Sequence, residues 1–315
     1  MTLIENLDEI PESLRNGVVT IGNFDGVHLG HATLIRRMRE YGDSPPVVVF
    51  TFHPHPAAVL RPENAPQPLT WINRKAKLLE RLGVDAVIAC PTSREMLEWS
   101  AETFFERILC EKLRARHVVE GTNFRFGRNR SGDVKKLGEL CRENGMTCEM
   151  VEPVVVGGSA VSSSRIRGLI SRGEIREANR LLTNPYRIRG MVVHGLARGR
   201  TLGFPTANLE AIDTLLPGHG IYAGRAIYND RFYPAAIHVG PNTTFHEKNP
   251  KVEVHILDFQ ESIYGKLLKV EFLEYLRGII AFSGRETLIM KIQEDVRRVR
   301  EAFQAENGGE IIRNA

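Results

Sequence analysis

The chain has 315 residues, of which 42% are hydrophobic and 25% charged, and this composition is typical of a globular protein with ample core-forming material. The length suggests about two domains. The 42 basic and 38 acidic residues give a net charge of +4 but are interspersed along the chain, which argues against a nucleic-acid-binding protein because such a protein needs a concentrated basic stripe.

The amino terminus and the cysteines predict a cytoplasmic protein with no membrane partner. The first nine residues carry acidic side chains where a signal peptide needs a basic region. No apolar run approaches the roughly 20 residues that cross a bilayer. The four cysteines show neither Cys-x-x-Cys nor metal-finger spacing, so we expect them to be reduced. A homo-oligomer is one of the states that the sequence leaves open.

A segment rich in glycine and histidine at residues 22–31 is the first candidate site. The β-branched run before it, at 18–21, predicts a buried strand, and residues 32–41 repeat apolar side chains at helical spacing. His28 and His31 then share one face at the start of the helix, where backbone N–H groups and the helix dipole favour a phosphate. For one such histidine alone, a cap or surface position is the alternative. The His-x-Gly-His pair resembles the signature of the nucleotidyltransferase superfamily.

Strand and helix patterns alternate through the first half of the chain. This alternation predicts a doubly wound, Rossmann-like parallel sheet, in which ligands bind beyond the carboxyl ends of the strands. The turns at those ends, at residues 22–31, 53–56 and 121–127, are therefore candidate binding segments. Further strands are predicted at 47–52, 84–89 and 117–120, and helices at 74–81 and 101–113.

A cluster of serine and arginine at residues 162–167 opens the next predicted helix, which continues after Gly173 as far as Leu182. A single serine there is explained as a helix N-cap. Three serines with two arginines exceed that need, and their hydroxyl and guanidinium groups suit the oxygens of a triphosphate. The pattern then becomes extended at Pro185, which predicts two domains, 1–184 and 185–315.

Strand patterns follow one another closely after Tyr186. Such runs indicate an antiparallel barrel or sandwich. A long amphipathic helix at 284–305 closes the chain, and we expect it to cover the core. The predicted strands are residues 188–193, 221–228, 232–239, 252–257 and 268–273.

A segment rich in glycine and arginine at residues 195–208 is the second candidate site. It lacks the Gly-Lys-Ser/Thr ending of a Walker A loop, but its flexible backbone with Arg198 and Arg200 can wrap a polyphosphate. Thr206 and Asn208 project from the same side of an extended segment, and their oxygens suit Mg²⁺. A polar β-turn is the alternative interpretation.

The strand predicted at residues 252–257 carries Glu253 and His255 on one face. A carboxylate in that position can accept the proton of an alcohol, which phosphoryl transfer to a hydroxyl requires besides positioning and charge stabilisation. The alternative is an ordinary surface carboxylate.

Six motifs in this order resemble the bacterial bifunctional riboflavin kinase/FMN adenylyltransferase family, or FAD synthetase, over nearly the whole chain. The resemblance implies a nucleotidyltransferase domain followed by an antiparallel β-barrel kinase domain with a C-terminal helix. It also implies that riboflavin and ATP give FMN, and that FMN and ATP then give FAD and pyrophosphate, with Mg²⁺ and without a covalent enzyme intermediate. The motifs lie at residues 22–31, 51–56, 121–127, 162–167, 203–208 and 252–258.

The resemblance further implies roles for individual residues. His28 and His31 would act in adenylyl transfer by contacting the ATP phosphates, and Glu253 would take the proton of the ribityl 5′-hydroxyl of riboflavin. The implied ATP-binding residues of the adenylyltransferase are Gly22, Asn23, Phe24, Asp25, Gly30, Ser163, Ser164 and Arg167, and its flavin-binding residues are Asn123, Phe124 and Phe126. In the kinase, ATP would meet Gly195, Arg198, Gly199, Arg200, Pro205, Thr206 and Asn208, Mg²⁺ would meet Thr206 and Asn208, and flavin would meet Glu253 and Arg277.

Three segments of the kinase half depart from the family pattern. Residues 238–245 and 182–186 each lack an arginine, and residues 278–281 replace an acidic and a basic residue. The sequence therefore leaves two alternatives to the bifunctional enzyme. One is an FMN adenylyltransferase whose degenerate kinase half is a flavin-binding or regulatory module, and the other is a basic nucleic-acid-binding protein without catalysis.

Overall fold

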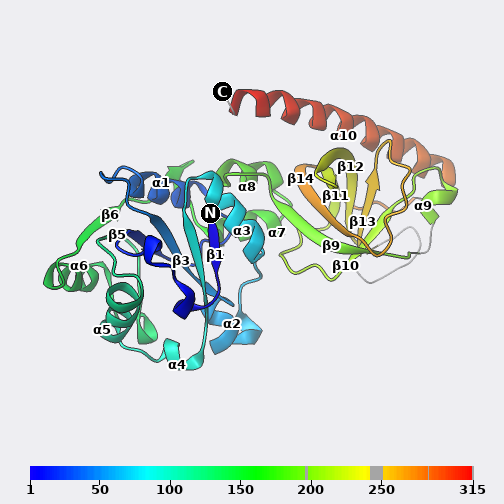
Figure 1. Cartoon of the computed structure of the whole chain (residues 1–315). Helices are drawn as coiled ribbons and strands as arrows, with labels where there is room; N and C mark the ends of the chain where they lie inside the picture. The colour runs from blue at the N-terminus through cyan, green and yellow to red at the C-terminus, as the bar shows by residue number, and fades with distance from the viewer. Residues whose placement is uncertain (196–197, 242–250, 283, 314–315) are drawn as a thin grey trace. The chain divides into compact units, whose positions relative to one another are not determined.

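The computed structural model describes residues 1–195, 198–241, 251–282 and 284–313, and for residues 198 and 306–313 it describes the backbone alone. Contacts divide the chain into two compact units, and Figure 1 labels many of their helices and strands. The domain boundary predicted between residues 184 and 185 stays a prediction. The first unit comprises Met1–Gln67 and Trp71–Ser163, and the second comprises Pro68–Thr70 and Ser164–Ala315.

The first unit is built on a parallel sheet of six strands in the order β1-β4-β3-β2-β5-β6. From β2 the chain adds β3 and β4 on one side, and it then places β5 and β6 on the other. The direction thus reverses between β2 and β5, where open α/β sheets bind ligands. The predicted doubly wound fold is confirmed. The strands are β1 Thr2–Ile4, β2 Val18–Ile21, β3 Val47–His53, β4 Ala86–Pro91, β5 His117–Gly121 and β6 Thr147–Val151.

Alternate residues of these strands point to opposite faces of the sheet and build two cores. Val47 and Val49 pack with residues of α1 and α3, whereas Val48 and Phe50 pack with residues of α5, the following π-helix and α6. Burial on both faces explains why the strands are almost continuously apolar. The helices are α1 Leu29–Met38, α2 Pro56–Leu60, α3 Ile72–Arg81, α4 Arg94–Leu97, α5 Ala101–Phe104, the π-helix Phe105–Lys112 and α6 Val134–Glu143. Short 3-10 turns lie at Leu7–Glu9, Glu12–Leu14, Pro62–Asn64 and Arg128–Arg130, and β7 Val155–Val156 pairs with β8 Ser159–Ala160.

Some bounds differ from those expected from the sequence. Helix α1 begins at Leu29, earlier than the predicted residue 32, because His28 already takes the extended conformation of an N-cap. Strand β4 lies slightly later than the predicted 84–89, and β1, α6 and β6 were not predicted. For α6 the signal was present, since Asp133 accepts a hydrogen bond from the backbone N–H of Lys136 as a helix cap.

The second unit is a closed barrel of six antiparallel strands, in the order β10-β13-β12-β11-β14-β9. The predicted barrel is confirmed. Asn229 and Asp230 join β11 to β12, and both have the positive φ that a two-residue hairpin turn requires. The strands are β9 Arg187–Val193, β10 Ala207–Glu210, β11 Gly220–Tyr228, β12 Arg231–Gly240, β13 Lys251–Ile256 and β14 Leu267–Arg277. The helices are α7 Ser163–Ser171, whose first residue belongs to the first unit, α8 Ile175–Leu181, α9 Arg198–Thr201 and α10 Arg285–Arg313.

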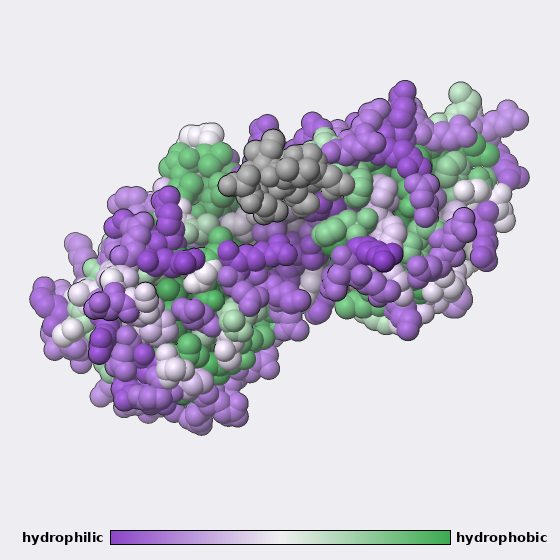
Figure 2. Space-filling model, turned by 45° about the horizontal axis from the view of Figure 1, so that its top comes forward, coloured by the Kyte–Doolittle hydropathy of each residue, from purple (hydrophilic) through white to green (hydrophobic). Residues whose placement is uncertain are grey.

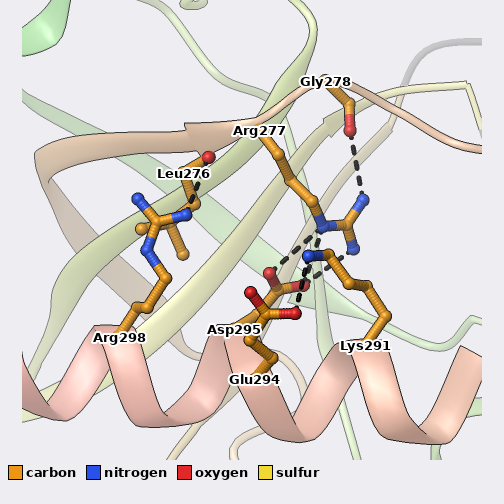
Figure 3. Close-up of polar contacts among 7 residues, drawn as sticks. All are labelled: Leu276, Arg277, Gly278, Lys291, Glu294, Asp295 and Arg298. Carbon is orange, nitrogen blue, oxygen red and sulfur yellow. Dashed lines mark hydrogen bonds and ion pairs between the residues drawn. The ribbon is translucent and has the colours of Figure 1, made fainter.

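Helix α10 covers part of the barrel and is tied to the end of β14 (Figure 3). Val299 of α10 is fully buried in one cluster with Ala223 of β11, as expected for a helix that covers the core. Arg277 forms a two-pronged ion pair with Asp295, at 3.1 and 2.7 Å, and donates to the carbonyl oxygen of Gly278 at 3.1 Å. Asp295 is 3% exposed and Arg277 is partly buried, so the pair is largely shielded from solvent. Arg277 therefore holds α10 to the barrel, and its expected contact with flavin stays a prediction.

Polar and charged residues cover most of the face shown in Figure 2, and hydrophobic residues show in separate areas between them. Within the described part of the chain, no helix combines the length and the apolar character needed to cross a membrane.

Candidate active sites

The turn after β2 has a backbone conformation that most side chains avoid. The φ angle is +46° at Phe24, +86° at Gly26 and +43° at Val27. This left-handed region is strained for bulky and β-branched residues, and it persists only where the surroundings hold it. Phe24 and Val27 are 2% and 0% exposed and belong to the core beneath α1 and α3. The core therefore fixes the turn in a conformation typical of functional sites.

Two histidine rings lie against each other at the start of α1. His28 precedes the helix, and the centroid of its ring is 3.6 Å from that of the stacked His31 ring. The backbone N–H of His28 donates to Nδ1 of His31 at 3.2 Å, which assigns the proton of a neutral His31 ring to Nε2. A Cβ at Gly30 would lie 3.2 Å from the His28 ring, so the glycine makes room for that ring. The His-x-Gly-His segment thus forms one compact group.

Both imidazoles are neutral at neutral pH. Burial lowers the pKa of His28 to about 4, and the charge of Asp25 opposes this effect only in part. Burial also lowers the pKa of His31 well below its ordinary value, and the charges of His28 and Lys75 act in the same direction. The pair therefore offers hydrogen bonds to a phosphate rather than two positive charges.

Two buried polar atoms beside the histidine pair have no hydrogen-bond partner among the described residues. They are Oδ1 of Asn23 and Nδ1 of His28. The Asn23 amide nitrogen lies 3.0 Å from Nε2 of His55, so the side chain is held while its oxygen is left over. A buried polar atom without a partner costs about 1–3 kcal/mol. Asn23 lines the neighbouring cavity, where a bound ligand would satisfy its oxygen, and this atom therefore indicates a binding site.

A cavity of about 800 Å³ lies beyond the carboxyl ends of β2 and β5. Asn23 and His55 line it together with Asn123, Phe124 and Phe126. The Phe124 and Phe126 rings are stacked at 5.4 Å, and aromatic walls with a few convergent polar groups are typical of small-molecule sites. The structure thus brings the predicted ATP-binding turn and the predicted flavin-binding segment to one cavity.

The buried carboxyl group of Glu120 lies between β2 and β5. Backbone pairing of β2 with β5 ends at Val19, opposite Val118. Beyond this pair, Glu120 accepts hydrogen bonds from the backbone N–H of Ile21 and from Oγ1 of Thr20. Burial raises the pKa of Glu120 well above its usual range. The Glu120 carboxyl group thus replaces the next backbone hydrogen bond between β2 and β5, the two strands between which the order of strand addition reverses.

Sequence reasoning did not select three residues of this region, namely His55, Lys75 and Glu120. His55 had a signal, since it lies in the turn after a predicted strand. Lys75 and Glu120 are charged residues inside an amphipathic helix and an apolar strand, and nothing local distinguishes them from surface residues.

The serine and arginine cluster is divided between the two units. Oγ of Ser163 donates to the carbonyl oxygen of Asp25 at 2.8 Å, so this serine supports the turn within the first unit. Ser164 and Arg167 lie in α7 of the second unit, where Ser164 is exposed and Arg167 is half-buried. Their role toward pyrophosphate stays a prediction.

Two of the predicted kinase residues, Glu253 and Asn208, lie opposite each other in adjacent strands of the barrel. In the strand register, Glu253 of β13 lies between Asn208 of β10 and His238 of β12. Its neighbours Val252 and Val254 are buried, so Glu253 points to the opposite side. Residues directly opposite in antiparallel strands share a face. The structure therefore places Glu253 beside Asn208 and adds His238, which the sequence indicated only as part of an altered segment.

The glycines of the loop before β10 lie against the predicted Mg²⁺ ligands. A Cβ at Gly195 would lie 2.3 Å from Nδ2 of Asn208, and a Cβ at Gly199 would lie 3.4 Å from Oγ1 of Thr206. The approach to Asn208 explains the glycine at position 195, whereas the glycine at position 199 is needed because a Cβ there would lie 2.3 Å from the carbonyl oxygen of Phe204. The backbone of the loop thus contacts both polar side chains.

Other predicted kinase residues line a cavity of about 360 Å³, among them Arg200, Pro205 and Thr206. Nδ1 of His255 lies 2.7 Å from the carbonyl oxygen of Pro205, which anchors the loop to β13. The side chain of Arg198 and residues 242–245 of the altered segment lie outside the described residues.

Comparison with known proteins agrees with this two-site arrangement. Residues 10–165 match the family model described as FAD synthetase, and residues 182–303 match that of riboflavin kinase. A bifunctional riboflavin kinase/FMN adenylyltransferase of Haemophilus influenzae is 33% identical to this chain over 97% of the chain and 100% of its own length. The chain belongs to this bifunctional family.

Other relatives lead to the same family. The bifunctional riboflavin kinase/FMN adenylyltransferase of Bacillus subtilis is 34% identical over 91% of this chain and 92% of its own. A solved structure of a protein called macrolide-efflux protein, from Streptococcus pneumoniae, has a TM-score of 0.85 and 32% identity, covering 95% of this chain and 98% of its own. Its name refers to efflux, whereas both family models that match this chain describe flavin enzymes.

The two-step flavin activity predicted from the sequence is therefore confirmed at the level of the family. The alternative of an adenylyltransferase with a degenerate kinase half is not favoured, because the riboflavin kinase model matches residues 182–303 and the relatives are named for both activities.

Proposed function

We propose that the turn at residues 22–31 and its cavity transfer the adenylyl group of ATP to FMN, and that the face formed by β10 and β13 phosphorylates riboflavin. The observation that carries the first assignment is the buried, unpartnered Oδ1 of Asn23, which lines a cavity walled by aromatic rings and belongs to the turn that carries His28 and His31. The second depends on the register that pairs Glu253 with Asn208. The functional boundary is proposed at residues 184 and 185.

In adenylyl transfer, a phosphate oxygen of FMN attacks the α-phosphorus of ATP, and pyrophosphate leaves. The neutral rings of His28 and His31 donate hydrogen bonds to phosphate oxygens, and the backbone N–H groups at the start of α1 attract the same negative charge. Positioning and electrostatic stabilisation are the main requirements of such a step, so the chain needs no covalent intermediate. Asn123, Phe124 and Phe126 hold the flavin in the cavity.

In the kinase reaction, Glu253 accepts the proton of the ribityl 5′-hydroxyl as that oxygen attacks the γ-phosphorus of ATP. Asn208 lies opposite Glu253 in the adjacent strand and orients the substrates. The loop before β10 supplies backbone N–H groups and Arg200 for the phosphates.

The donor set before and within β10 fits Mg²⁺. Thr206 and Asn208 offer a hydroxyl and an amide oxygen beside a loop whose Gly195 closely approaches the Asn208 amide. In the described part of the chain, no three acidic, histidine or cysteine side chains gather as in an all-protein metal site. Mg²⁺ commonly takes few protein ligands and completes its shell with water and substrate phosphates. When bound there, the ion would neutralise phosphate charge.

A paired experiment tests both assignments in the full-length protein. With riboflavin, ATP and Mg²⁺, His31→Ala should accumulate FMN without FAD, and Glu253→Ala should form FAD only from supplied FMN. Chromatography of the products measures both outcomes. His117→Ala, at the amino end of β5, and Glu210→Ala, an exposed carboxylate at the end of β10, serve as matched controls that keep both activities.

The outcome that contradicts the two-site proposal is loss of both reactions in each variant with the fold intact. FAD formation that survives in His31→Ala would remove the adenylyl-transfer site from the turn.

A further inference from the structure

A buried ammonium group contacts the backbone of the turn that carries the two histidines. Lys75 of α3 is 6% exposed, and its Nζ donates to the carbonyl oxygen of Asn23 at 2.6 Å and lies 3.4 Å from Oγ1 of Thr51. The Thr51 hydroxyl donates to the same carbonyl at 3.2 Å. Lysine is rarely buried, because an ammonium group loses its hydration there. Its position therefore calls for a reason beyond packing.

Lys75 holds the residue whose side chain faces the cavity. Lys75 anchors the backbone carbonyl of Asn23, and His55 contacts the nitrogen of its side-chain amide. The oxygen of that side chain, Oδ1, is one of the two unpartnered atoms. A charged donor makes a stronger hydrogen bond than a neutral one. The ammonium group thus fixes the start of a strained turn, and with it the position of His28 and His31.

Lys75 also places a positive charge close to the proposed phosphate site. The titratable groups that act on it from the neighbouring segments are Asp25 in the turn and His31 in α1, and β3 contributes the uncharged Thr51. Burial lowers the pKa of Lys75 to about 8, so the side chain is charged at neutral pH and loses its proton within an accessible pH range. Charges in such a buried environment interact more strongly than surface charges.

We propose that Lys75 is a positioning residue of adenylyl transfer, which holds the turn for ATP through the Asn23 carbonyl and favours the triphosphate through its charge. This inference rests on the proposed placement of the adenylyl-transfer site at residues 22–31.

The test compares Lys75→Met with Lys77→Met in the full-length protein. Lys77 is exposed on the same helix and is the matched control. Lys75→Met should lower kcat/KM for ATP in FAD formation about ten- to hundredfold, because a charge-assisted hydrogen bond is lost. FMN formation in the same variant, and both activities of Lys77→Met, should stay within about twofold. Fluorescence of Trp71 and Trp99, both in the first unit, reports whether that unit is folded.

A second measurement separates positioning from a merely structural role. For the unmodified enzyme, kcat/KM for ATP should fall as the pH rises through about 8, because the ammonium group is then deprotonated. Lys75→Arg keeps the charge and should retain activity without this fall. A lysine that only stabilises the fold would change the unfolding midpoint and leave the pH profile as it is.

A folded Lys75→Met protein with unchanged kcat/KM for ATP overturns the inference. If that variant does not fold, the unmodified enzyme decides, since a profile that is flat between about pH 7 and 9 contradicts it. His31→Ala distinguishes the two proposals. FAD formation that survives in His31→Ala refutes the site itself, whereas loss in His31→Ala with full activity in Lys75→Met refutes only the role of Lys75.

Discussion

Glutamine and valine at position 120 should have different effects on the first unit. Glu120 accepts the backbone N–H of Ile21 and the hydroxyl of Thr20 where the pairing of β2 with β5 has ended. Glu120→Gln keeps a side-chain oxygen that can accept the same hydrogen bonds. Glu120→Val leaves the buried N–H of Ile21 without an acceptor, which costs about 1–3 kcal/mol in free energy of unfolding. We therefore expect the valine variant to be less stable than the glutamine variant by about this amount.

The stability that Glu120 contributes should also depend on pH. Burial raises the pKa of Glu120 above its value in the unfolded chain, so the folded state binds the proton more tightly. Its contribution to stability is complete below the unfolded pKa and is lost as the pH rises through the folded pKa. Glutamine does not titrate. The stability of the unmodified protein relative to Glu120→Gln should therefore fall as the pH rises above about 4.3.

Urea unfolding followed by tryptophan fluorescence measures this effect in the right unit, since the chain has two tryptophans and both lie in the first unit. FAD formation from FMN should follow the stability order, because the same strands carry the turn and the Asn123 segment. FMN formation from riboflavin is the internal control. Equal stability of the glutamine and valine variants, or a difference from the unmodified protein that does not change with pH, would refute the role given to this carboxyl group.

Two further predictions concern the barrel. Gly195→Ala should displace the side-chain amide of Asn208, because the added Cβ would lie 2.3 Å from it. The variant should form less FMN from riboflavin and keep FAD formation from FMN. Unchanged kinase activity would contradict the placement of Asn208. Asp295→Ala should leave the partly buried Arg277 without its carboxylate and lower the stability of the barrel by about 1–3 kcal/mol. Thermal inactivation of the kinase measures this, and an unchanged midpoint would show that the pair is not essential.

Local periodicity was sufficient for much of the fold. The alternation of strand and helix patterns in the first half predicted the doubly wound sheet, and the alternating run at β13 placed Glu253 and His255 opposite the buried valines. Edge elements gave a weaker signal, because β6 is only partly buried and therefore lacks the apolar run of the central strands. Helix α1 was placed late because the cap conformation of His28 is not encoded by the apolar spacing.

The sequence by itself determined the two-part fold, the family and the His-x-Gly-His turn, since these depend on residue order and on periodicities within short segments. Only the tertiary structure decided that Lys75 reaches Asn23 from 52 residues away and that Glu120 reaches Ile21 from 99 residues away. It also turned Arg277 toward Asp295 of α10. The physical reason is that the partner of a buried charged side chain depends on which segments pack around it and on the order of the strands. Both are defined only in the folded chain.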